Sequence, residues 1–90
     1  MNYKMRINGN SELEAPVKHM EQVDEASVII DDIGEFKSPT TGYVFEKIEL
    51  IGDDGEVYAM RKIPKHLMIT VTPKMSLTFQ WRLTIDKALA

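Results

Sequence analysis

Residues 67–86 alternate between apolar and polar side chains almost without error. Every odd position in this stretch is apolar, and nine of the ten even positions are polar, with Met68 as the exception. A period of two residues is typical of a β-strand that buries one face. The pattern therefore assigns Phe79 and Trp81 to the core and Arg82 to the opposite face.

An unbroken strand over this whole stretch would be too long for the chain. Twenty extended residues reach about 66 Å, whereas a domain of this size has a radius of gyration of about 12 Å. We expect a turn or bend at Pro73, because proline cannot donate a hydrogen bond to a sheet. A three-residue turn at 72–74 would pair Val71 with Met75 on the core face. A sharp bend or bulge at Pro73 within one strand is the alternative.

Two shorter segments are also predicted to be strands. Tyr3–Ile7 alternates and ends at an Asn8-Gly9-Asn10 sequence, whose residues tolerate a positive φ angle. Ser27–Asp31 contains a run of β-branched residues, which favour strands. Residues 34–42 combine Gly, Ser, Thr and Pro and are expected to form a loop.

Residues 43–63 are predicted to form a β-hairpin around an Asp-Asp-Gly sequence. A three-residue loop with its glycine in the left-handed conformation would pair Leu50 with Tyr58. A two-residue turn would instead set Ile48 against Arg61, which sorts apolar from polar side chains less well. Both faces of the hairpin carry apolar residues near the turn. We therefore expect the core to cover one face, and a short helix or a partner subunit to cover the other.

Residues 16–25 are predicted to form a short helix. Proline fits the first position of a helix, and Val17, Met20 and Val23 would then share one apolar stripe. A helix of about ten residues is too short to be stable without packing against other elements. The alternative is that residues 13–17 extend as an edge strand.

Together these elements predict a mainly β fold (β-rich α+β) in a single domain that spans residues 1–90. About six mostly antiparallel strands would form a small barrel or a sandwich, with one short helix near residues 16–25. Either arrangement reduces the number of open sheet edges. The sequence contains no internal repeat and no linker that would divide it.

The composition narrows the class of protein. There is no cysteine, which excludes disulfides and thiolate metal sites. The first six residues lack the apolar stretch of a signal peptide. No run of about 18 apolar residues could span a membrane. These features predict a cytoplasmic protein that does not bind membranes.

Charge is divided unevenly along the chain, whose net charge is −3. Residues 1–56 hold 13 acidic and 5 basic residues (net −8), whereas residues 57–90 hold 1 acidic and 6 basic residues (net +5). The two halves can attract each other within one fold, or oppositely charged surfaces can stack in an oligomer. A charged surface can also bind a partner of opposite charge.

The sequence shows no arrangement of residues typical of catalysis. Its serines lie in no nucleophile motif, and His19 and His66 are expected on the surface with no nucleophile nearby. The acidic clusters at 31–35 and 53–56 do not match the spacing of a calcium loop. We therefore predict no enzymatic activity, no cofactor and no metal site.

These patterns predict a non-catalytic module for protein binding or assembly, acting through sheet surfaces or by self-association. Proteins of this size and charge occur among the accessory or inhibitory proteins of mobile elements, a comparison that rests on size alone. The predicted interface combines the second face of the hairpin with the Thr-rich face of the C-terminal stretch: Phe45, Ile51, Val57, Ala59, Lys74, Gln80 and Arg82.

The alternative function is the binding of single-stranded nucleic acid. The basic sequence 61–66 contains Arg61, Lys62 and Lys65, and a small barrel with a basic stretch is typical of OB-type single-strand binders. The alternation opposes this function, because it places Trp81 in the core and leaves the polar face without an aromatic residue for base stacking. The negative net charge also opposes binding to phosphates.

Overall fold

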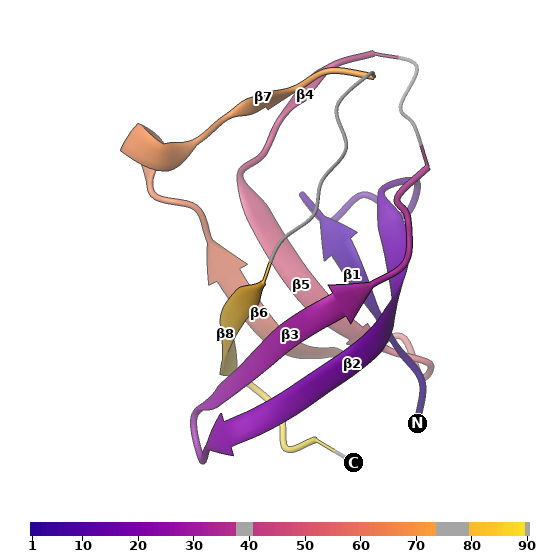
Figure 1. Cartoon of the computed structure of the whole chain (residues 1–90), viewed down its shortest axis with the longest axis vertical. Coiled ribbons are helices and arrows are strands. Elements are labelled where there is room, and N and C mark those ends of the chain that lie inside the picture. The colour runs from indigo at the N-terminus through magenta and orange to yellow at the C-terminus, as the bar shows by residue number, and fades with distance from the viewer. Residues whose placement is uncertain (38–40, 74–79, 90) are drawn as a thin grey trace.

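The computed structural model describes residues 1–37, 41–73 and 80–89 (Figure 1). Within these residues, six antiparallel strands form a closed barrel in the order β1-β2-β3-β8-β6-β5. This confirms the predicted mainly β fold and selects the barrel over the sandwich. The barrel strands are β1 (Tyr3–Ile7), β2 (Glu14–Asp24), β3 (Ser27–Ile33), β5 (Lys47–Gly52), β6 (Val57–Lys62) and β8 (Trp81–Ile85).

A smaller unit lies outside the barrel. Strands β4 (Tyr43–Val44) and β7 (Thr70–Val71) form a two-stranded sheet, and the short 3-10 helix η1 (Lys65–Leu67) precedes β7. In Figure 1 this unit lies above the upper end of the barrel. In the described parts of the chain, no helix has the length and apolar character needed to cross a membrane.

The barrel closes through β8, which lies between β3 and β6. Trp81 faces Ile30, and Leu83 faces Val28, so β8 directs its alternate apolar side chains into the barrel. At the opposite side of the barrel, β1 pairs with both β2 and β5. Closure leaves none of these six strands with an open edge.

Alternation along the strands fills the interior with apolar side chains. In β1, Tyr3, Met5 and Ile7 are buried, while Lys4 and Arg6 between them are partly exposed, as predicted. A large-to-small substitution of a buried residue costs about 2–5 kcal/mol. The largest fully buried side chains are Met5, Ile7, Val28, Ile30, Ile48, Leu50, Ile51, Val71 and Leu83.

The predicted helix at residues 16–25 is wrong, because this segment belongs to strand β2. β2 pairs with β1, where Pro16 faces Lys4, and it pairs with β3 along the rest of its length. Both neighbours supply ladder hydrogen bonds, whereas a helix of about ten residues would be marginal. Proline is tolerated because Pro16 belongs to the terminal pair of the β1 ladder and precedes the first pair of the β3 ladder, Val17 with Ile33. The alternative, an extended strand at residues 13–17, is confirmed from Glu14 onward, but β2 is not an edge strand because it pairs with both β1 and β3.

The turn of the predicted hairpin has the expected three-residue form. The Gly52 N–H donates to the Glu56 carbonyl (3.0 Å), and the Gly55 N–H donates to the Gly52 carbonyl (3.0 Å). Gly55 has a φ of 81°, the left-handed conformation that glycine adopts without strain.

Beyond this turn, the register of the hairpin differs from the prediction. Leu50 faces Ala59 rather than Tyr58, and Ile48 faces Arg61. A bulge causes the difference, because β6 contributes Tyr58 as an extra residue before Ala59. Both Tyr58 and Ala59 are buried as a result, although regular alternation would direct them to opposite faces.

The alternating stretch at residues 67–86 is not one strand. Its start lies in η1, β7 pairs with β4, and β8 enters the barrel. The alternation correctly predicts the burial of Val71 and Leu83, but Leu67 and Ile69 are exposed. The partner predicted for Val71, Met75, lies outside the described residues, as does Phe79.

Asn8 joins the end of β1 to the chain between β4 and β5. It has a φ of 54° and is followed by Gly9 at 66°, which confirms the predicted turn. Its side-chain oxygen accepts hydrogen bonds from the N–H groups of Glu46 (2.8 Å) and Lys47 (3.1 Å). Its side-chain nitrogen donates to the Val44 carbonyl (2.6 Å). Asparagine suits this position because it tolerates the left-handed conformation better than most residues.

We expect the substitution Asn8→Ala to lower the free energy of unfolding by about 2–4 kcal/mol. Each lost hydrogen bond contributes about 0.5–1.5 kcal/mol, and alanine at positive φ costs about 1–2 kcal/mol. Denaturant unfolding measures the change. The control is Asn10→Ala, which removes one side-chain hydrogen bond to the Glu12 N–H. Equal losses in the two variants would contradict the assigned role of Asn8.

Candidate functional site

Exposed apolar side chains gather in the unit outside the barrel, residues 43–44 and 65–71, which we call the flap. Val44 is 44% exposed, Leu67 is 55% exposed and Ile69 is 48% exposed. Val44 pairs with Thr70, the residue that follows Ile69, so the three lie in one small unit. Exposed apolar residues grouped in this way are typical of interaction sites. None of the three was predicted as a site residue.

The inner side of the flap packs on the barrel. The Phe45 N–H, just after β4, donates to the Ile69 carbonyl (2.8 Å). Val71 is only 2% exposed, and Met68 packs against the core. Because Met68 is the residue that packs inward, its neighbours Leu67 and Ile69 remain exposed, and the alternation of the sequence is reversed at this point.

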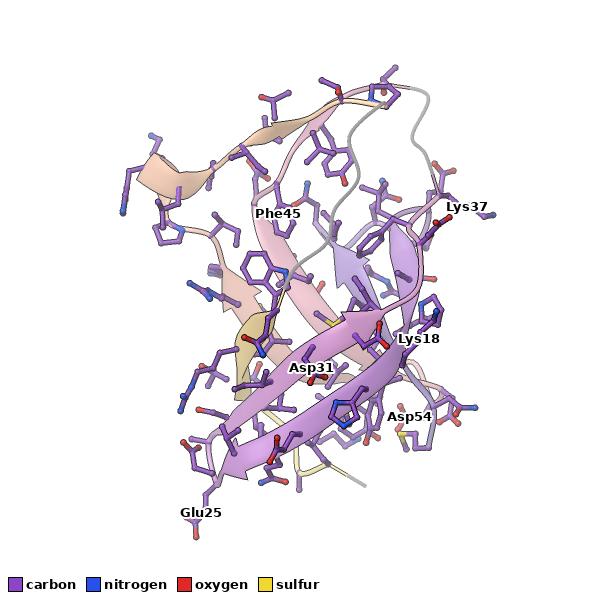
Figure 2. All side chains as sticks on the ribbon, viewed as in Figure 1. Lys18, Glu25, Asp31, Lys37, Phe45 and Asp54 are labelled. Carbon is purple, nitrogen blue, oxygen red and sulfur yellow. The ribbon has the colours of Figure 1, made fainter. Side chains whose placement is uncertain are left out.

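An aromatic stack lies between the flap and the barrel. Figure 2 shows Phe45 at the start of the chain that enters β5. The rings of Phe45 and Trp81 are stacked, with centroids 5.5 Å apart and an interplanar angle of 25°. The Arg61 guanidinium lies 5.2 Å from the centroid of the Trp81 ring, a distance at which a cation attracts an aromatic face.

Basic side chains lie in the flap and next to it. Lys62, Lys65 and His66 are exposed. Among the residues described by the structure, neither Lys62 nor Lys65 has an ion-pair partner. A groove of about 270 Å³ opens beside the flap, lined by Asn8, Glu46, Lys47, Lys62, Ile63 and Met68. The flap therefore presents apolar side chains next to a groove that contains two lysines.

A second, shallow groove brings together residues from both functional predictions. This groove lies between β6 and β8 and has a volume of about 610 Å³. It is lined by Arg61 and Lys62, from the nucleic-acid prediction, and by Arg82, from the interface prediction. Lys65 does not line this groove. Among the described residues that line it, none is aromatic, and Asp86 adds a negative charge.

Three of the predicted interface residues are covered by their own chain. Ile51 and Ala59 are fully buried, and Phe45 is 3% exposed. The expectation that this face of the hairpin is open to a partner is therefore wrong for these residues. The physical reason is that barrel closure and the bulge in β6 bury apolar residues of both parities near the turn.

The other predicted interface residues do not form one surface with them. Val57 is partly exposed, near the turn of the β5–β6 hairpin. Gln80 and Arg82 are exposed, as predicted, and the Arg82 guanidinium pairs with Asp24 (3.0 Å). Lys74 lies outside the described residues.

The histidines do not line either groove described above. His66 is exposed in η1. His19 is also exposed, and its Nδ1 atom lies 2.5 Å from an Asp31 carboxylate oxygen. The hydrogen bond to Asp31 raises the pKa of His19. In the described part of the chain, no group of three or more His, Cys, Asp or Glu side chains is arranged to hold a metal ion.

Comparison with known proteins assigns no relative to this chain. No protein-family model, no curated protein and no solved structure matches it significantly. The geometry of its own residues therefore carries the functional argument.

A strongly shifted tyrosine lies away from the flap, beside the turn of the β5–β6 hairpin. The Tyr58 hydroxyl donates to an Asp54 carboxylate oxygen (2.6 Å), and this hydrogen bond raises the pKa of Tyr58 to about 12. The same hydrogen bond lowers the pKa of Asp54. The Tyr58 ring packs edge-on against Tyr3 (5.3 Å), and the Lys87 ammonium lies 5.1 Å from its centroid. Tyr58 thus stabilises this end of the barrel.

Protein stability should fall as the pH rises from about 10 to about 12. In this range the unfolded chain loses the Tyr58 proton near the ordinary pKa of 10, whereas the folded chain keeps it up to about 12. Absorbance titration of tyrosinate should show that Asp54→Asn moves the pKa of Tyr58 down toward 10. The control Asp53→Asn removes a neighbouring charge that makes only a minor contribution. An unchanged pKa in Asp54→Asn would contradict the assignment.

Proposed function

We propose that this chain is a non-catalytic protein-binding module that uses the flap and its adjacent groove. One observation carries the proposal. Of the five large apolar side chains exposed in the described residues, three (Val44, Leu67 and Ile69) lie in the flap. The barrel is closed and its core is complete without these three side chains. The rest of the fold therefore gives no reason for exposed apolar residues at these positions.

The flap also offers main-chain hydrogen bonds. In the part of the chain described here, β4 and β7 pair only with each other, so each keeps one open edge. A partner strand can add to such an edge, with main-chain hydrogen bonds providing affinity and side-chain contacts providing specificity. This mode of binding suits a flap whose strands are only two residues long, because a partner strand would extend a sheet that is small by itself.

The magnitude of the apolar contribution indicates what else a partner must supply. Burying the exposed parts of the three side chains would contribute about 2–4 kcal/mol at most. A dissociation constant of about 1 mM requires about 4 kcal/mol, and association has further entropic costs. A specific partner must therefore add hydrogen bonds and charge interactions. Lys62 and Lys65 favour a partner with acidic side chains.

A second candidate function is the binding of single-stranded nucleic acid in the groove between β6 and β8. It is supported by the convergence of Arg61, Lys62 and Arg82 on that groove. Base stacking, however, needs exposed aromatic rings. Phe45 is buried, and the Trp81 ring is occupied by its stack with Phe45 and by Arg61. Among the described residues, the groove thus has cations without an exposed aromatic ring for stacking, and we rank this function second.

The proposed function predicts that two substitutions in the flap, Leu67→Asp with Ile69→Asp, reduce partner capture at least tenfold. The tagged full chain is used as bait in a lysate of its source organism, and the captured proteins are quantified by mass spectrometry. The matched control is Gln80→Asp with Thr84→Asp, which adds the same charge to two exposed positions, one just before β8 and one in it. Thermal unfolding must show that both variants remain folded.

Three outcomes separate the candidates. Proteins captured by the wild type and the control but lost with the flap variant support the proposed function. Capture of the same proteins by the flap variant would overturn it. If the control variant alone loses binding to a fluorescent single-stranded oligonucleotide, the groove between β6 and β8 is the binding site, and the second candidate takes its place.

A further inference from the structure

We propose that the flap binds a second copy of this chain, at the tip of the β2–β3 hairpin, so that molecules associate head to tail. The inference rests on the proposed function of the flap and adds the identity of the partner. Complementary charges and exposed apolar side chains at the two ends of the molecule support it.

The tip of the β2–β3 hairpin, which we define as residues 21–25, is exposed throughout. In the sequence of this tip, the acidic residues Glu21 and Glu25 flank the apolar residue Val23. Val23 is 40% exposed, although it is a β-branched apolar residue. Figure 2 shows Glu25 at the free end of the hairpin. Among the described residues, neither glutamate forms an ion pair.

The flap carries the complementary pattern. Its exposed apolar residues Leu67 and Ile69 lie close to Lys65 in sequence, and Lys62 lies at the end of β6 beside the groove. Opposite charges around an apolar contact steer association and fix the orientation of the partners. Both charged sets are exposed and available, since neither is neutralised by ion pairs within the described chain.

The two surfaces cannot meet within one molecule. The tip of the hairpin lies at the lower end of Figure 1 and the flap at the upper end, along the longest axis of the molecule, which extends 35 Å. A contact between unlike surfaces of two copies is heterologous, so each copy offers one tip and one flap. Such contacts build a ring if they close and an open chain if they do not.

Asp24 is left out of the proposed contact, although it lies in the tip. Its carboxylate accepts a hydrogen bond from the Ala26 N–H (2.8 Å) and pairs with Arg82 (3.0 Å). These contacts hold the hairpin turn and connect it to β8. Charge-reversed variants should therefore change Glu21 and Glu25 and keep Asp24.

The test compares wild type with two charge-reversed variants by sedimentation velocity over a range of concentrations. The tip variant carries Glu21→Lys and Glu25→Lys, and the flap-charge variant carries Lys62→Glu and Lys65→Glu. We expect the mass of the wild type to rise above the monomer mass of 10.3 kDa with concentration. Each variant alone should remain at 10.3 kDa, because its two ends then carry the same charge. Thermal unfolding confirms that both are folded.

An equimolar mixture of the two variants is the decisive sample. The basic tip of one variant fits the acidic flap of the other, and the acidic tip of the second fits the basic flap of the first. Association should therefore return to the level of the wild type. A mixture that stays monomeric would overturn the inference.

Two further results would overturn the head-to-tail contact while leaving the proposed function to the capture experiment. One is a wild type that stays monomeric at every concentration. The other is association that is lost with Leu67→Asp and Ile69→Asp but persists in the tip variant. The second result would mean that the flap binds a different surface of the second copy.

Discussion

The position of β8 between β3 and β6 is the constraint on which the rest of the structure depends. Without β8 both neighbours would keep an open edge, and the core would lose Leu83, which is 1% exposed. Closure of the barrel also determines which segments of the chain lie outside it. Once six strands enclose the apolar interior, β4 and the segment from η1 to β7 lie outside the barrel, and they form the flap.

Closure also explains the uneven distribution of charge along the sequence. It brings the C-terminal basic residues next to N-terminal acidic residues, as in the pairs Arg82–Asp24 (3.0 Å) and Lys87–Asp54 (4.0 Å). This bears out attraction between the two halves within one fold. Exposed pairs of this kind contribute about 0–1 kcal/mol each, so burial of apolar side chains holds the barrel together. Within the residues that the structure describes, Lys62, Lys65 and the glutamates of the hairpin tip form no ion pair, which leaves them for other contacts.

The local pattern of the sequence was sufficient where one strand forms a regular ladder. β1, its turn at Asn8, the loop of the β5–β6 hairpin and the inward face of β8 follow directly from alternation and turn chemistry. β2 could not be predicted in this way. Pro16 and the stripe of Val17 and Met20 suit a helix locally. The extended form is favoured only by pairing with β1 and β3, and this pairing cannot be read from the segment's own residues.

The candidate site was missed for a related reason. Leu67 and Ile69 have the parity of core residues, and burial cannot be read from parity once a turn of 3-10 helix intervenes. The signal was present in the sequence, because Met68 is the one apolar residue at an even position. It packs inward, and its neighbours face solvent. An error in an otherwise regular alternation can thus indicate where a strand ends and a surface begins.

Amide hydrogen exchange tests the central role of β8 most directly. The Ile85 N–H, at the end of β8, donates to the carbonyl of Ala26 in the turn between β2 and β3 (2.8 Å), whereas the Phe45 N–H donates to Ile69 in the flap. If β8 closes the barrel, the Ile85 amide exchanges only through global unfolding, with the free energy measured by denaturant. The Phe45 amide should exchange faster, through local opening of the flap. Exchange of Ile85 as fast as that of Phe45 would show that β8 separates without unfolding and would contradict this account.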